Sequence, residues 1–111
     1  YISRFDARER AVLPNCDDSL SKDVWLNHGW RDRPREQEYL FDLVFDPNEA
    51  HNLIADPALA GVLEEMRARL IRWMQKTSDP LLDGPVPAPA DAVVNDRDGL
   101  SPSEQPKTTQ S

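Results

Sequence analysis

The sequence predicts a small α+β fold, in which a short antiparallel sheet is covered by a long C-terminal helix. Residues 38–45 carry apolar side chains at every odd position, which is the period of a strand with one buried face. Residues 59–77 carry apolar side chains three and four positions apart, which is the period of a helix with an apolar stripe. These two patterns define the expected core.

The first expected element is a strand at Tyr1–Phe5. A strand needs neighbours, and since one other convincing strand follows, we expect further strands upstream and regard the chain as a fragment of a longer parent. A loop at residues 15–19 is rich in Asn, Asp and Ser, which favour turns. It leads to a short helix through residues 21–27 that Ser21 caps and that Gly29 ends in left-handed geometry.

The segment after the second strand has the sequence of a capping box at residues 46–49. Asp46 is expected to accept a hydrogen bond from an amide of the next turn, and Glu49 to reach back to the start of that turn. Pro47 fits the first helical position, so we expect one helical turn to follow.

Asp56 and Pro57 repeat this device and begin the long helix, which is expected to run to about Lys76. Pro80 ends it, because a residue that precedes proline disfavours helix. Beyond this point prolines are frequent and no periodic pattern survives. We therefore divide the chain into a compact part at residues 1–78 and an acidic, Pro-rich, extended or disordered tail at residues 79–111.

The charge of the chain argues against a nucleic-acid partner. The formal net charge is -7, and the basic residues are interleaved with acids instead of clustered for phosphate contacts. Anionic polymers are poor candidates for the same reason, and no apolar run approaches the length that spans a membrane. The single cysteine excludes an intrachain disulfide but leaves the compartment open, so the localisation is unknown.

Cysteine and histidine do not form a convincing catalytic or metal-binding pattern. No second cysteine accompanies Cys16, and neither His28 nor His51 has a partner at ligand spacing. Residues 46–49 lack the donors of an EF-hand loop. We predict a polar turn with a partly buried Cys16 thiol, and no catalytic or metal-binding residue in this chain. An independent hydrolase that uses Cys16 and a histidine is the competing hypothesis, and it predicts that Cys16→Ala abolishes activity.

Trp25, His28 and Trp30 form the most interesting polar and aromatic group. Aromatic faces and an imidazole beside an acidic loop could line a sugar-binding rim. Packing in the core is the competing interpretation of the same three side chains.

Several motifs resemble the C-terminal region of the sulfatase family. Members carry a Leu-Tyr-Asp-Leu strand, an Asp-Pro-x-Glu turn and an Asn-Leu pair there, and a helix follows. The matching segments here are Leu40-Phe-Asp-Leu43, Asp46-Pro-Asn-Glu49, Asn52-Leu53, Asp56-Pro57 and the helix that contains Trp73. The resemblance covers about residues 1–90 and is nearest to the heparan N-sulfatase (sulfamidase) group.

This resemblance implies a parent protein of alkaline-phosphatase-like α/β fold, of which the chain is the C-terminal subdomain. It implies an enzyme that hydrolyses sulfate esters or sulfamates of a sulfated small molecule or sugar. Such a parent carries calcium and a formylglycine, made from Cys or Ser, in the N-terminal catalytic domain against which this chain would pack. In the family, that Cys or Ser begins a Cys/Ser-x-Pro/Ala-x-Arg motif. Cys16 does not match this motif, because Leu20 stands where the motif needs Arg. Neither cofactor is therefore expected on this chain.

Two functions from different classes compete. The leading hypothesis is a sulfatase subdomain that gives structural support, with residues 15–30 as a candidate part of the substrate rim. The alternative is a free-standing acidic protein-interaction module without catalysis, which packs its helix against a partner.

Overall fold

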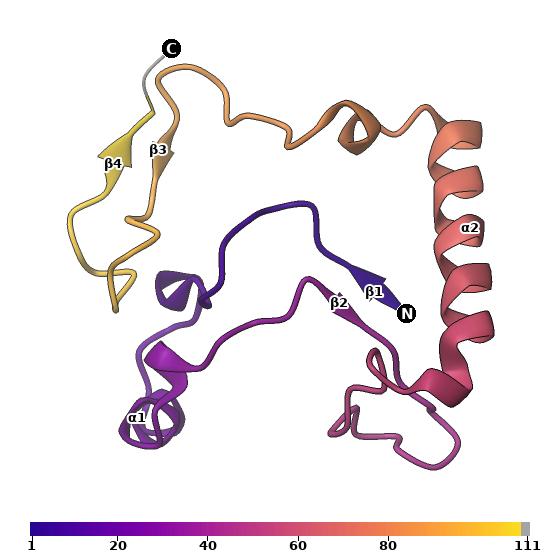
Figure 1. Ribbon diagram of the computed structural model, residues 1–111. Coiled ribbons are helices and arrows are strands. Elements are labelled where there is room, and N and C mark those ends of the chain that lie inside the picture. Colours follow the sequence, from indigo (N-terminus) through magenta and orange to yellow (C-terminus); the bar gives the residue numbers. More distant parts are fainter. Residues whose placement is uncertain (110–111) are drawn as a thin grey trace. The chain divides into compact units, whose positions relative to one another are not determined.

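The computed structural model describes residues 1–109 of the 111-residue chain, and over those residues the fold is α+β (Figure 1). The described part contains two α-helices and two two-stranded antiparallel sheets. The chain forms two compact units. The first consists of Tyr1–Ala7 and Glu36–Val86, and the second of Arg8–Arg35 and the segment that begins at Pro87.

The sheet of the first unit joins β1 (Ile2–Ser3) to β2 (Glu38–Tyr39) in antiparallel register (Figure 1). Ile2 lies opposite Tyr39, and Ser3 lies opposite Glu38. The Arg4 amide donates to the Gln37 carbonyl at 2.9 Å, which extends the pairing by one bond. The predicted opening strand is thus present, though it is shorter than expected.

The predicted strand at residues 38–45 is wrong beyond its first two residues. The Asp42 carboxylate accepts hydrogen bonds from the amides of Val44 and Phe45 at 3.0 and 3.3 Å, which closes a turn in place of a strand. Phe45, predicted to face the core, is 88% exposed. Leu40, at an even position, is buried instead.

The segment after this turn is a second turn and not the predicted helical turn. Asp46 accepts as expected, from the amides of Ala50 at 3.1 Å and His51 at 2.8 Å. Glu49 is exposed and has φ of 53°, a left-handed conformation that excludes the expected capping-box geometry.

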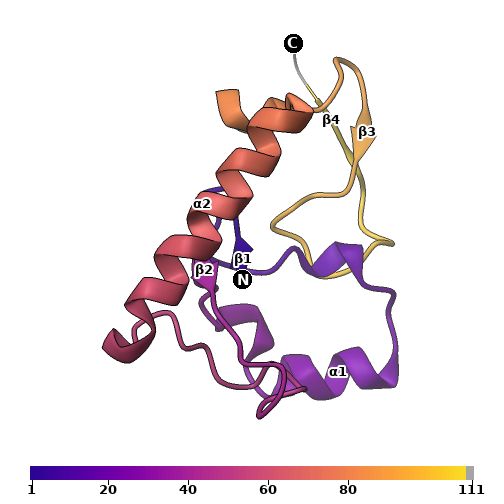
Figure 2. The ribbon, with the colours of Figure 1, turned by 90° about the vertical axis from the view of Figure 1, so that its right-hand side faces the viewer.

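The helix α2 (Ala60–Thr77) is the longest element of the first unit (Figures 1 and 2). It follows the 3-10 helix η3 (Pro57–Leu59), for which Asp56 accepts from the Ala58 amide at 2.9 Å. Its Leu63 and Met74 side chains are buried. The helix is not C-terminal as predicted, because the 3-10 helix η4 (Pro80–Asp83) and two strands follow it.

The second unit combines short helical turns with a small sheet. Its elements are η1 (Leu13–Asn15), α1 (Leu20–Asn27), η2 (Trp30–Asp32), β3 (Val93–Val94) and β4 (Lys107–Thr108). In α1 the cap is Ser19 and not Ser21 as predicted, because the Ser19 hydroxyl accepts from the Lys22 amide at 3.1 Å. Gly29 has φ of 84°, which confirms its predicted left-handed geometry.

The segment predicted as an extended or disordered tail contains ordered pairing. Strands β3 and β4 are antiparallel, with Val93 opposite Thr108 and Val94 opposite Lys107. The three boundaries between the units follow Ala7, Arg35 and Val86, whereas we divided the chain after residue 78. Residues 110 and 111 of the predicted tail lie outside the described residues.

The core is small for a chain of this length. The buried apolar side chains of the described part are Leu13, Leu40, Leu63 and Met74. The surface area of 8598 Å² exceeds even the roughly 7,500 Å² of two separate compact bodies of half this mass. No described helix has both the length and the apolar character that crossing a bilayer requires.

Candidate functional site

The three residues predicted for a sugar-binding rim lie around one hollow of the second unit. Trp25, His28 and Trp30 line a space of about 430 Å³ together with Gly29, Asp32 and Arg33. The Trp25 side chain is 59% exposed, so it is not a core residue. The three residues therefore line one hollow, and the sugar-binding rim stays a prediction.

Local backbone geometry brings these side chains together. The helix α1 ends at Asn27, and the left-handed Gly29 turns the chain directly into η2. Trp25 on the last turn of α1 and Trp30 at the start of η2 thus flank the same space. The His28 Nδ1 lies 2.7 Å from the Val24 carbonyl, which can only accept, so Nδ1 carries the proton of this bond.

A second hollow of the same unit is lined by arginines. It measures about 250 Å³, and its lining includes Arg8, Arg10, Arg31 and Arg97 with Asp98. Sequence reasoning missed this group because each arginine has acidic neighbours along the chain. Arg8 and Arg10 are two positions apart, a spacing that puts both on one side of an extended segment, but no signal links them to Arg97.

Arg8 builds the frame of this arginine-lined hollow. Its guanidinium forms an ion pair with Asp98 at 2.9 Å. It also donates to the backbone carbonyls of Arg97 at 2.6 Å and Arg10 at 3.1 Å. With 23% of its side chain exposed, Arg8 holds two separate segments of the second unit in place.

The other three arginines are more accessible. Arg10 is paired loosely with Asp32 at 3.5 Å, and both side chains are mostly exposed. Arg31 and Arg97 are exposed, and within the described residues neither has a carboxylate at ion-pair distance. Arg31 and Arg97 thus differ from Arg8 and Arg10, which are both paired with carboxylates.

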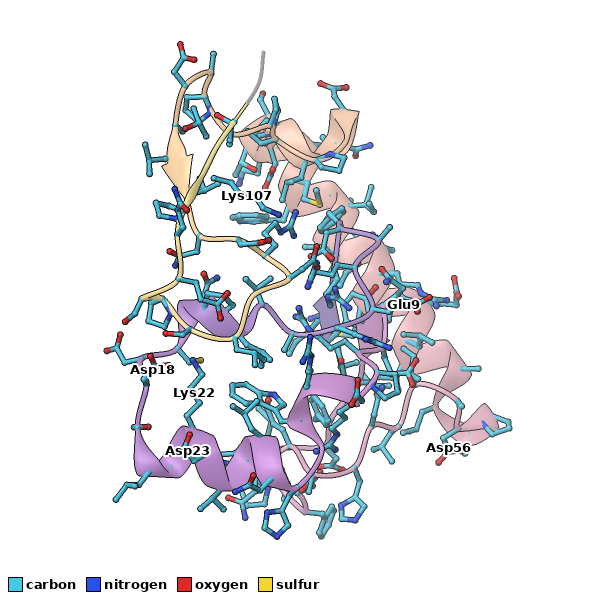
Figure 3. All side chains as sticks on the ribbon, turned by 90° about the vertical axis from the view of Figure 1, so that its left-hand side faces the viewer. Glu9, Asp18, Lys22, Asp23, Asp56 and Lys107 are labelled. Carbon is cyan, nitrogen blue, oxygen red and sulfur yellow. The ribbon has the colours of Figure 1, made fainter. Side chains whose placement is uncertain are left out.

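The loop around Cys16 is held by hydrogen bonds from the Lys22 side chain. Lys22 extends from α1 toward the loop of Asp18 (Figure 3), and its Nζ donates to the Cys16 carbonyl at 2.8 Å and to Asp18 at 2.9 Å. A hydrogen bond from Ser101 and the nearby Lys22 lower the pKa of the Asp18 carboxyl. The thiol of Cys16 is exposed, so the prediction of a partly buried thiol is wrong.

No candidate metal centre is found among the described residues. Within residues 1–109, no three His, Cys, Asp or Glu side chains are grouped so that they could hold a metal ion. No described hydrogen bond joins Cys16 Sγ to a histidine.

Comparison with known proteins finds one informative relative. The chain is 36% identical over 101 residues to N-sulphoglucosamine sulphohydrolase of Homo sapiens. This match covers 86% of the chain but 19% of the human enzyme, so the chain spans about a fifth of that relative's length. No protein-family model matches the chain. No solved structure matches it either. The likeness to a sulphohydrolase supports a sulfatase-like origin for the chain.

Proposed function

We propose that the chain is the C-terminal subdomain of a sulfatase that hydrolyses sulfate esters or sulfamates. The 36% identity to N-sulphoglucosamine sulphohydrolase over 101 residues carries this proposal. The name of that relative gives an N-sulfated sugar as its substrate, which makes a sulfated sugar the first choice here. The α+β architecture of the described residues is compatible with such a subdomain.

The N-terminal catalytic domain of the parent supplies the chemistry in this proposal. Formylglycine provides the nucleophile there, and calcium neutralises the charge of the sulfate oxygens. This chain contributes support for that domain and part of the substrate rim. Trp25 and Trp30 offer aromatic faces to a sugar ring, and the unprotonated Nε2 of a neutral His28 can accept from a sugar hydroxyl.

The exposed apolar surface supports a subdomain that packs against a larger body. On α2, Trp73 is 57% exposed, Val62 49% and Ile71 42%. Val62 and Trp73 share one face of α2 about three turns apart, whereas Ile71 lies on the opposite face, so the helix exposes apolar side chains on two sides. A larger body that covers these sides would bury them. The same surface favours the alternative function, a free-standing acidic interaction module, and the unfolding experiment described in the Discussion separates the two.

Activity of the complete protein tests the proposal. We expect the full-length chain to release sulfate from N-sulfoglucosamine or from an aryl sulfate. Replacing the Cys or Ser of an upstream Cys/Ser-x-Pro/Ala-x-Arg motif by Ala should abolish this release. A full-length sequence without that motif, or a pure protein that releases no sulfate from either substrate, would refute the proposed function.

Variants at the aromatic hollow test the rim separately. We expect Trp25→Ala and Trp30→Ala each to raise the KM for the sugar substrate about tenfold, since a sugar ring that covers roughly 50 Å² of an indole face gains about 1.3 kcal/mol from apolar burial. The KM for a small aryl sulfate should change little, and Phe45→Ala serves as the control, since Phe45 is an exposed aromatic residue that does not line the hollow. Equal effects of all three variants on both substrates would argue against a rim.

A further inference from the structure

We propose that the arginine-lined hollow binds a sulfate group of a sulfated saccharide whose sugar ring lies in the adjoining aromatic hollow. The choice of a sulfated sugar rests on the proposed function. The binding of an anion rests on the geometry of the second unit alone.

Positive charge is concentrated in the lining of the arginine-lined hollow. The lining residues include four arginines and one aspartate, although the chain as a whole has a net charge of -7. Asp98 neutralises Arg8, whereas the exposed Arg31 and Arg97 have no carboxylate partner among the described residues. An anion between them would relieve the repulsion of like charges. The planar fork of a guanidinium matches two oxygens of a sulfate group.

The arginine-lined hollow is preorganised without a ligand. Arg8 fixes the backbone of Arg97 and Arg10 through its bonds to their carbonyls. Gly99 also lines the hollow, and a Cβ there would lie 2.3 Å from the Glu104 carboxylate. That carboxylate is itself held by the amides of Leu100 and Ser101, at 2.9 and 3.0 Å. Anion binding therefore needs little additional ordering.

The aromatic hollow adjoins the arginine-lined hollow. Trp30 and Asp32 of η2 line the aromatic hollow, whereas Arg31 between them lines the arginine-lined hollow. The ion pair of Arg10 and Asp32 joins the two linings. At about 250 Å³ the arginine-lined hollow is smaller than most pockets for whole ligands, roughly 300–1,000 Å³, so it suits one anionic group. A sugar ring with a sulfate substituent fits both.

Equilibrium binding to the full-length protein tests the proposal. Glucosamine 6-sulfate, glucosamine and inorganic sulfate are each titrated into the wild type by calorimetry. The same titrations use the double variant Arg31→Gln with Arg97→Gln. Arg72→Gln on α2 is the control for loss of a surface arginine, since Arg72 does not line the hollow. We expect the double variant to bind the sulfated sugar at least about tenfold more weakly, and the control to match the wild type.

Each outcome bears on the proposal. Unchanged binding in the double variant, or an equal loss in Arg72→Gln, overturns the site. Inorganic sulfate that binds as tightly as the sulfated sugar, with the same dependence on Arg31 and Arg97, supports the anion site and overturns the contact with the ring. Turnover of an aryl sulfate is measured in parallel. If turnover is absent while arginine-dependent sugar binding persists, the proposed function fails and the anion site stands.

Discussion

At the residue scale, Asn52 holds together the two halves of the first unit's chain reversal. Its Oδ1 accepts from the amides of Leu40 at 2.9 Å and Ile54 at 3.2 Å, and its Nδ2 donates to the Glu38 carbonyl at 3.0 Å. The Leu53 amide adds a bond to the Leu40 carbonyl at 2.8 Å. One side chain thus satisfies backbone groups that a third strand would otherwise have paired.

Replacing Asn52 should therefore weaken the fold. We expect Asn52→Ala to lower the free energy of unfolding by about 2–3 kcal/mol, because partly buried backbone groups lose their partners. Urea unfolding of the full-length protein, followed by tryptophan fluorescence, measures the change. Asn48→Ala is the control, since Asn48 is exposed, and should cost less than about 0.5 kcal/mol. Equal effects of the two substitutions would contradict this role of Asn52.

Glu49 gives the opposite kind of prediction. Its left-handed backbone, with φ of 53°, is unfavourable for a residue with a side chain. We expect Glu49→Gly to raise the free energy of unfolding by about 0.5–1 kcal/mol and Glu49→Ala to give no gain. Thermal melting of both variants beside the wild type provides the comparison. A destabilised glycine variant would show that the Glu49 side chain matters more than its backbone.

These residues show which details a sequence can predict. Asp46 and Asp56 cap turns as expected, because a carboxylate and an amide a few residues away are brought together by local geometry. The sign of φ at Glu49 was not predictable, because it depends on where Leu53 must return to meet Leu40.

At the element scale, β2 shows the limit of periodicity. The alternation over residues 38–45 correctly located β2 but overestimated its length. The partner strand β1 pairs at two positions, and the Asp42 carboxylate accepts the hydrogen bonds of the Val44 and Phe45 amides that a longer strand would have donated to a neighbour. Alternation records which side chains are apolar. It does not record whether a partner strand exists.

The link between α2 and β2 is an ion pair with a hydrogen-bonded tyrosine. Arg67 of α2 contacts Glu38 at 2.5 and 2.8 Å, and the Tyr1 hydroxyl donates to the same carboxylate. Hydrogen bonds from Arg67 and Tyr1 lower the pKa of Glu38 to about 2. The same Glu38 contact raises the pKa of Arg67. The negative charge of Glu38 is thus more favourable in the folded chain than in the unfolded one.

This pKa shift predicts a loss of stability in acid. In the unfolded chain, Glu38 takes up a proton near its ordinary pKa of 4.5, whereas in the folded chain it does so near pH 2. The stabilisation by the Glu38 charge is therefore complete above pH 4.5 and is lost as the pH falls to about 2. Against the wild type, we expect Glu38→Gln to cost about 1–2 kcal/mol at pH 6 and almost nothing at pH 2.

Urea unfolding of both proteins at several pH values measures this difference. Glu65→Gln is the control, because the pair of Glu65 and Arg69 at 2.6 Å is mostly exposed and should be worth less than about 0.5 kcal/mol. A cost of Glu38→Gln that stays constant from pH 6 to pH 2 would contradict the assignment.

At the scale of the whole molecule, sequence reasoning found one hollow and missed the other. Trp25, His28 and Trp30 are six residues or fewer apart, so a helix end and one glycine bring them together. The arginine-lined hollow combines Arg8 with Arg97, which meet only because the second unit is built from two distant segments. An average of charge along the chain could not reveal it.

The exposed surface predicts how the isolated 111-residue chain behaves. With few buried apolar side chains and 8598 Å² exposed, we expect it to bind a hydrophobic dye strongly and to unfold over a broad temperature range. Dye fluorescence and scanning calorimetry measure both properties. The sulfatase subdomain predicts this behaviour, whereas a sharp cooperative transition of a monomer would favour the free-standing interaction module.

The exposed Cys16 has a practical consequence. It is the single cysteine of the chain, so a maleimide fluorophore would attach at one defined position without prior mutagenesis. Lys22 bonds to its backbone carbonyl and not to its sulfur, so labelling leaves that bond in place. Cys16 directly follows η1, whose Leu13 lines the arginine-lined hollow. The emission of a fluorophore on Cys16 can thus report the binding of a ligand in the arginine-lined hollow.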